Sequence, residues 1–216
     1  MTHFNLPNLD IGQEVFLFLL KGFREEKGMY FAINLGDGTV NVTKEEYTVY
    51  KEKLKSLYYL SSIPDAKERE ERYIDWAIGC VKDPLTESDG MLDLLNEKRT
   101  NTLYRDITAN PYKLTITQNK ELCEVIYSKK DLGYLDINFI SYLYKDKENK
   151  ELLDFLIKWT KRTTVNRDNL FILKESLDLI AMSIKDEELM ILNDQVKKAK
   201  EDKAKQKLIK QFIRKI

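Results

Sequence analysis

The chain of 216 residues carries 36 basic and 36 acidic side chains, and 43% of its residues are hydrophobic. This length and this composition suffice for a folded core and argue against a disordered chain. The longest apolar run, residues 15–20, is far shorter than the roughly 18 residues that a membrane-spanning helix needs, and no cleavable leader precedes it. We therefore expect a cytoplasmic protein without membrane contact.

Charge is spread unevenly along the chain. Residues 196–216 contain nine basic and two acidic side chains, so this tail has a net charge of +7 and the rest of the chain −7. Such a tail indicates contact with nucleic acid or another anionic partner, or docking on the acidic body of the same chain. Lysine far outnumbers arginine, and the abundance of Lys, Asn, Ile and Tyr is typical of AT-rich coding. We therefore expect a low-GC bacterium or its phage as the source.

The N-terminal part of the chain is predicted to form strands. Residues 15–20 lack a helical polar face, and residues 29–35 are rich in aromatic and branched side chains that favour a pleated setting. Gly36-Asp37-Gly38 supplies the positive φ angles of a tight hairpin, and residues 39–42 alternate as a return strand. The sequence thus predicts a small antiparallel β-meander over residues 15–42.

The remainder of the chain is predicted to be helical. Thr43 can cap a helix that extends to about residue 60, and Pro64 then breaks the pattern. The break divides residues 1–62 from residues 63–216, either as two domains or within one continuous domain. Residues 83–90 are expected to be a loop and residues 113–117 a strand. The helices predicted after the break are 66–81, 91–99, one from residue 117, 137–144, 147–161, 168–182 and 185–214. The predicted class is therefore α+β, mostly α-helical, with the small N-terminal antiparallel β-meander packed with a helical body.

Two apolar stripes at helical spacing are predicted to belong to the core of this body rather than to a cofactor site. They consist of Leu152, Phe155, Leu156, Trp159, Leu170, Leu173, Leu177 and Ile180. Cys80 and Cys123 lack the spacing of a metal or redox pair, so both are predicted to be buried free thiols.

Most common catalytic arrangements are missing. The only histidine is His3, so no catalytic triad and no multi-histidine metal site can be built, and no Walker-type phosphate loop occurs. Glu148-Asn149-Lys150, with Asp136 upstream, matches the Glu-x-Lys pattern of metal-dependent nucleases, but a solvated helix start is the favoured reading. We therefore expect no catalytic residues, no cofactor and no bound metal, and hence no enzyme.

Residues 11–39 resemble the first two strands of OB-fold nucleic-acid-binding domains, in which a glycine-led strand, a basic loop and an aromatic strand end in an Asp-Gly turn. The resemblance implies aromatic residues for base stacking and cations beside the nucleic-acid backbone. These residues are Tyr30, Phe31, Lys21, Arg24 and Lys27. A helix is predicted from Thr43, where the barrel would continue, so a meander that covers helices is the alternative.

The basic C-terminal helix is the second candidate site. Its apolar positions change phase between residues 189–199 and 208–216, with lysines in the space between. One end could pack on the chain's own domain while the other presents a lysine-rimmed apolar face to a partner. The alternative is a solvated helix with ordinary docking contacts. The predicted partner-binding residues are Lys203, Lys207, Leu208, Lys210, Phe212, Ile213 and Arg214.

These observations favour a non-enzymatic accessory or regulatory protein that acts through protein–protein contact and is encoded by a phage or mobile element. The alternative is a single-strand nucleic-acid-binding module that uses the OB-like hairpin together with the basic helix. The shortage of arginine argues against this alternative, because lysine lacks the bidentate phosphate contacts of arginine. The sequence predicts neither the identity of the partner nor the oligomeric state.

Overall fold

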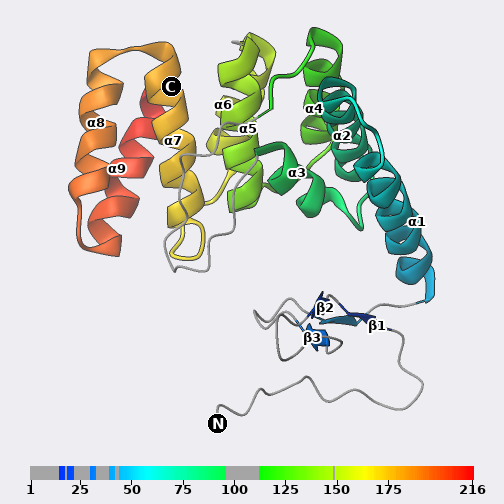
Figure 1. Cartoon of the computed structure of the whole chain (residues 1–216). Helices are drawn as coiled ribbons and strands as arrows, with labels where there is room; N and C mark the ends of the chain where they lie inside the picture. The colour runs from blue at the N-terminus through cyan, green and yellow to red at the C-terminus, as the bar shows by residue number, and fades with distance from the viewer. Residues whose placement is uncertain are drawn as a thin grey trace. The chain divides into compact units, whose positions relative to one another are not determined.

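The computed structural model describes residues 15–17, 19–21, 30–32, 39–41, 44–95, 112–147 and 149–216. The chain divides into two compact units, residues 1–70 and residues 71–216. The helices in the described residues are α1 (Lys44–Ser61), α2 (Ala66–Val81), α3 (Glu87–Leu95), α4 (Ile116–Tyr127), α5 (Tyr134–Lys147), α6 (Lys150–Arg162), α7 (Leu170–Ile184), α8 (Glu187–Lys198) and α9 (Asp202–Lys215) (Figure 1).

The described residues of the first unit include four strands of three residues each, which form two antiparallel pairs. They are β1 (Val15–Leu17), β2 (Leu19–Lys21), β3 (Tyr30–Ala32) and β4 (Thr39–Asn41). β1 pairs with β4, and β2 pairs with β3. A meander would instead place β3 beside β4, but in the described strands these two are not neighbours.

The prediction of an α+β fold with an N-terminal β-meander is therefore wrong. From residue 47 to residue 215 the described chain contains helices and no strand. The predicted strand segments do contain short strands, but strand propensity specifies neither which strands pair nor whether they join into one sheet. The predicted hairpin turn Gly36-Asp37-Gly38 and the predicted helix cap Thr43 lie outside the described residues.

The long predicted helices are confirmed. α2 has its predicted bounds. α1 begins directly after its predicted cap and ends one residue after its predicted end, and α5, α6 and α7 begin and end within three residues of their predictions. The predicted division between residues 62 and 63 falls inside the first unit and stays a prediction.

α3 corrects the predicted loop at residues 83–90, because this helix begins at Glu87 and contains Gly90. Gly90 is buried, and a Cβ atom at this position would lie 2.6 Å from the Ala77 carbonyl oxygen and 2.6 Å from the Val81 nitrogen of α2. Its missing side chain thus permits close approach of two helix backbones. Glycine is commoner in loops and at helix ends than inside a helix, so a loop was the natural reading of residues 83–90.

α4 begins with a capping box. The Gln118 backbone N–H donates to Thr115 Oγ1 at 3.2 Å, and the Thr115 N–H donates to Gln118 Oε1 at 2.9 Å. Residues 112–115 form no strand, so the strand predicted at residues 113–117 is wrong, and the helix begins one residue before its predicted start. The extended backbone of the helix cap accounts for the strand-like pattern.

The core of the second unit lies along the predicted stripes. Seven of the eight stripe residues are buried, and Phe155 packs half-buried against them. Cys80 and Cys123 are buried free thiols, as predicted. Burial raises the pKa of the Cys123 thiol to about 11, although the hydrogen bond from Asn149 Nδ2 acts to lower it. The thiol is therefore protonated and unreactive at neutral pH.

The single helix predicted at residues 185–214 is wrong, because α8 ends at Lys198 and α9 begins at Asp202. The change of phase in the apolar pattern marks this turn. Without the turn, the apolar positions of residues 189–199 and those of residues 208–216 would face different directions on one helix. With it, α7, α8 and α9 lie side by side (Figure 1). The buried apolar residues of α8 and α9 then belong to one core cluster.

Candidate functional site

The apolar side of α9 belongs to the core of its own unit. Ile209 and Phe212 are fully buried. Leu208, Ile213 and Ile216 are half-buried and pack against the same cluster. Three residues predicted to bind a partner, Leu208, Phe212 and Ile213, are thus engaged within the fold, and the Phe212 ring is not accessible to a partner.

Both ends of α9 are tied to neighbouring elements. In its first turn, Asp202 Oδ2 lies 3.2 Å from Arg167 Nε of the α6–α7 loop. In its last turn, Lys215 forms an ion pair with Glu188 of α8. The Ile216 carbonyl oxygen accepts a hydrogen bond of 2.6 Å from Lys161 Nζ of α6. These contacts and the buried side chains fix the direction in which the remaining side of α9 points.

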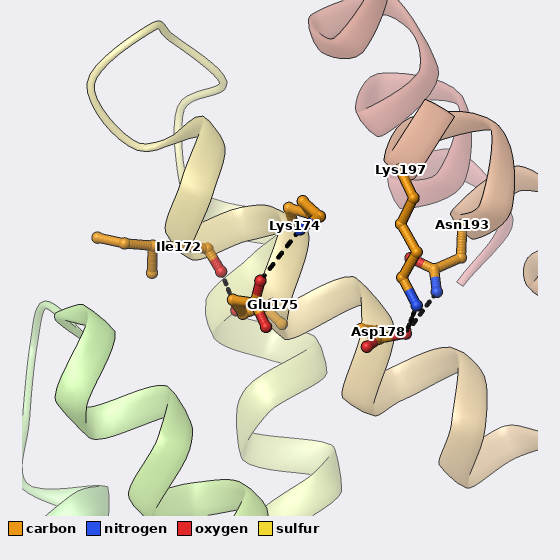
Figure 2. Close-up of polar contacts among 7 residues, drawn as sticks. Ile172, Lys174, Glu175, Asp178, Asn193 and Lys197 are labelled. Carbon is orange, nitrogen blue, oxygen red and sulfur yellow. Dashed lines mark hydrogen bonds and ion pairs between the residues drawn. The ribbon is translucent and has the colours of Figure 1, made fainter. Parts of the chain in front are cut away.

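A polar cluster joins α8, the neighbour of α9, to α7. Asp178 Oδ1 accepts hydrogen bonds from Asn193 Nδ2 at 2.7 Å and from Lys197 Nζ at 2.5 Å. Figure 2 shows both donors reaching from α8 toward Asp178 on α7, one helical turn along from the half-buried pair of Lys174 and Glu175. Asp178 therefore positions the surface on which α9 packs.

This cluster predicts a loss of stability in acid. Burial alone would raise the pKa of Asp178, but the hydrogen bonds from Lys197 and Asn193 outweigh it and hold the pKa below its ordinary value of 3.8. A lowered pKa stabilises the fold above pH 3.8, and this stabilisation disappears as the pH falls through the folded-state pKa.

We expect the free energy of unfolding of Asp178→Asn to fall less steeply below about pH 4 than that of the wild type, with a difference of at most about 1 kcal/mol because the group is partly exposed. Urea denaturation at a series of pH values measures it. Glu175→Gln is the control, because it removes a nearby carboxylate that makes no contact with Asn193 or Lys197. Parallel pH curves for Asp178→Asn and the wild type would contradict the assignment.

The opposite side of α9 is a row of exposed cations, which we call the basic face. Its members recur at helical spacing and line one shallow surface pocket together with Gln206 and Gln211. They are Lys203, Lys207, Lys210 and Arg214. None of these four forms an ion pair with the described part of the chain. All four were predicted from the sequence, whereas the two glutamines were missed, although each lies three or four residues from two of the cations and therefore beside them on the helix.

Only part of the positive charge of the basic tail is paired with carboxylates of the same chain. Lys197, Lys198 and Lys215 form ion pairs with carboxylates of the same chain. The four cations of the basic face point to solvent instead. α9 docks through its apolar side and keeps a concentrated positive charge on its outer side.

The predicted nucleic-acid residues of the N-terminal unit are only partly described. Lys21 lies opposite Tyr30 and Leu20 opposite Phe31 in the register of β2 and β3. Arg24 and Lys27 lie outside the described residues. The structure thus brings Lys21 and Tyr30 together on paired strands and does not test a nucleic-acid surface.

The suggested metal-dependent nuclease site has other contacts where it is described. Asp136 Oδ1 lies 2.5 Å from Lys129 Nζ, and Asp136 Oδ2 accepts a 2.6 Å hydrogen bond from the Gly133 N–H. Lys129 also lies 2.9 Å from Glu87 Oε1. Burial alone would lower the pKa of Lys129, but its bonds to Asp136 and Glu87 outweigh burial and raise it. Asp136 therefore holds a lysine in place.

The Glu-x-Lys triplet begins at Glu148, which lies outside the described residues. Asn149 caps α6, since its Oδ1 accepts from the Glu151 N–H at 3.0 Å and from the Leu152 N–H at 3.2 Å. Lys150 is exposed. Within the described ranges, no group of three or more His, Cys, Asp or Glu side chains is placed to hold a metal ion.

The chain matches no protein-family model, no curated protein and no solved structure. Among the described helices, none combines the length and the apolar character needed to cross a membrane. The arguments for function therefore rest on the chemistry of the surfaces described above.

Proposed function

We propose that this chain is a non-enzymatic accessory or regulatory protein that binds an acidic surface of another protein through the basic face of α9. The observation that supports the proposal is the row of four exposed cations that form no ion pair with the described residues, on a helix whose other side is fixed in the core. Clustered like charges repel one another and add nothing to the fold, so a partner is the better explanation of their position. We place the protein in the cytoplasm and expect a phage or mobile element to encode it.

The rigid backbone of α9 favours binding. A helix that is already docked loses little conformational entropy when a partner engages its outer side. Lysine and arginine at successive turns attract an acidic surface over a distance and raise the rate of association. Gln206 and Gln211, between them, can donate and accept the hydrogen bonds that fix the orientation of the partner.

The same row of cations favours a second candidate, the single-strand nucleic-acid-binding module. Each cation of the basic face could meet one phosphate of an extended strand. Three of the four are lysines, which bind phosphate as point charges and neither stack on bases nor form bidentate contacts. The protein partner therefore remains the first proposal.

Fluorescence anisotropy of the full chain with two labelled probes, a glutamate-rich peptide and an oligothymidylate, distinguishes the candidates. Two variants with the same change in charge are compared with the wild type. The basic-face variant carries Lys203→Gln, Lys207→Gln, Lys210→Gln and Arg214→Gln. The control variant replaces four exposed lysines elsewhere and carries Lys113→Gln, Lys120→Gln, Lys150→Gln and Lys158→Gln.

We expect the peptide to bind the wild type and the control variant. Its affinity for the basic-face variant should be at least about tenfold weaker, because four charges that attract it are removed together. Tighter binding of the oligothymidylate, with log K falling against log salt at a slope of about −3 for four neutralised phosphates, would favour the nucleic-acid candidate. Equal loss of peptide binding in both variants would show attraction by net charge alone and contradict the proposal.

A further inference from the structure

A second surface feature of the helical unit is a pocket of about 520 Å³ between the α4–α5 loop, the end of α6 and the start of α7. This volume lies in the range of small-molecule sites. The sequence analysis did not find it, because its walls come from three separate segments. The pocket is lined by Lys130, Asp131, Leu132, Trp159, Arg162, Thr163, Thr164, Asn169 and Ile172.

The lining combines apolar and cationic groups. Leu132 and Trp159 are buried core residues, and Ile172 is half-buried beside them, so together they supply an apolar wall. Lys130 and Arg162 contribute two positive charges against the single negative charge of Asp131. An apolar wall with a few convergent polar groups is the usual composition of a ligand site.

The cation at the end of α6 is held in place. Arg162 Nη2 donates a 2.8 Å hydrogen bond to the Lys130 carbonyl oxygen, which fixes the guanidinium beside the α4–α5 loop. Its remaining N–H groups are donors that suit an oxyanion. The Lys130 ammonium forms no hydrogen bond or ion pair with the described residues, so it can turn toward a ligand in the same pocket.

The N-terminal end of α7 adds to the positive electrostatic potential that Lys130 and Arg162 create in the pocket. Asn169 precedes the first turn of α7 but makes no capping bond with it. Its side chain instead donates to the Thr164 carbonyl oxygen at 2.5 Å and accepts from the Asn166 N–H at 3.1 Å. The positive end of the α7 dipole borders the pocket, which Asn169 and Ile172 line, and it has no side-chain acceptor from its cap residue.

We infer that this pocket binds a small organic anion. A phosphate or carboxylate group lies beside Lys130 and Arg162, and the apolar part of the molecule lies on Leu132, Trp159 and Ile172. Phosphate and carboxylate groups both present the anionic oxygens that the two cations recognise. A direct comparison of a phosphate probe with a carboxylate probe shows which group binds more tightly. The inference does not depend on the basic face of α9 and stands or falls independently of the proposed function.

Trp159 provides the readout, because the chain has only two tryptophans. In a Trp76→Phe variant of the full chain, the emission of Trp159 is observed alone. It is titrated with phenyl phosphate, benzoate and the neutral benzyl alcohol. Isothermal calorimetry of the wild-type chain with the same three probes gives the affinities without any substitution.

We expect saturable changes with at least one anion and a much weaker response to benzyl alcohol. The tighter of the two anions identifies the headgroup. Lys130→Gln should weaken the binding of that anion about tenfold, because one charge-assisted contact is lost while the bond from Arg162 to the Lys130 carbonyl remains. Lys158→Gln, an exposed lysine of α6 that does not line the pocket, should leave it unchanged. Binding of benzyl alcohol as tight as that of the anions, an equal effect of the two substitutions, or no saturable binding at all would overturn the inference.

Discussion

Phe212→Ala is expected to lower the free energy of unfolding by about 3–5 kcal/mol, the usual cost of truncating a large aromatic side chain in a closed core. The ring is fully buried and lies in the cluster that α9 shares with the preceding helices. Its removal leaves a cavity that the neighbouring helices can fill only in part. Urea denaturation of the full chain, followed by circular dichroism, measures the loss.

The matched substitution is Arg214→Ala, which lies two residues further along α9 on the exposed side. We expect it to change the free energy of unfolding by no more than about 0.5 kcal/mol. Comparing the two variants distinguishes the stability contribution of a buried side chain from that of an exposed one on the same helix. Should Phe212→Ala cost less than about 1 kcal/mol, the apolar side of α9 would not be packed as described, and it would be available to a partner after all.

Gly90→Ala is expected to destabilise the chain by about 1–3 kcal/mol or more, because the new methyl group must displace backbone atoms of α2. A Cβ atom at this position would lie 2.6 Å from both the Ala77 oxygen and the Val81 nitrogen, and 2.9 Å from Cys80 Cβ. Backbone of a packed helix cannot move aside as the end of a flexible side chain would. Thermal and urea denaturation measure the change.

Whether Gly90→Ala lowers or raises the free energy of unfolding distinguishes a closely packed glycine from an exposed one. In an exposed helix, replacing glycine by alanine stabilises by up to about 1 kcal/mol through helix propensity. Ser88→Ala, two residues earlier on the exposed side of α3, reports that propensity term without the steric clash. A Gly90→Ala variant as stable as Ser88→Ala, or more stable than the wild type, would contradict the close packing of α3 on α2.

The parts of the fold that follow from local periodicity were predictable. The stripe that begins at Leu152 and the one that begins at Leu170 repeat at helical spacing, and a buried helix face needs little more than this pattern. α2 was equally clear because Pro64 marks its start and its apolar positions recur to Val81. These elements depend on neighbours a few residues apart, which a sequence shows directly.

The errors arose where a residue's role depends on a distant neighbour. Gly90 indicates a turn until the backbone of α2 lies against it. The apolar residues 29–35 favour a strand, but nothing local states which strands pair or whether a sheet forms. Such information is tertiary, and sequence periodicity does not contain it.

The candidate site divides in the same way. Lys203, Lys207, Lys210 and Arg214 were predictable as cations on one side of a helix. The role of Phe212 was not, because an amphipathic helix has an apolar side whether it docks on its own domain or on a partner. The pocket beside Trp159 was missed since three segments build it.

The central claim is that the exposed cations of α9, and not its apolar side, engage an acidic partner. The most direct measurement is the affinity of the natural partner for the basic-face variant and for the control variant. The partner is first identified by purification from the native source and then isolated, and the affinity is measured by calorimetry between purified proteins. The basic-face variant should bind at least about tenfold more weakly than the wild type, and the control variant should bind as the wild type does. Equal affinities for the two variants would contradict the account.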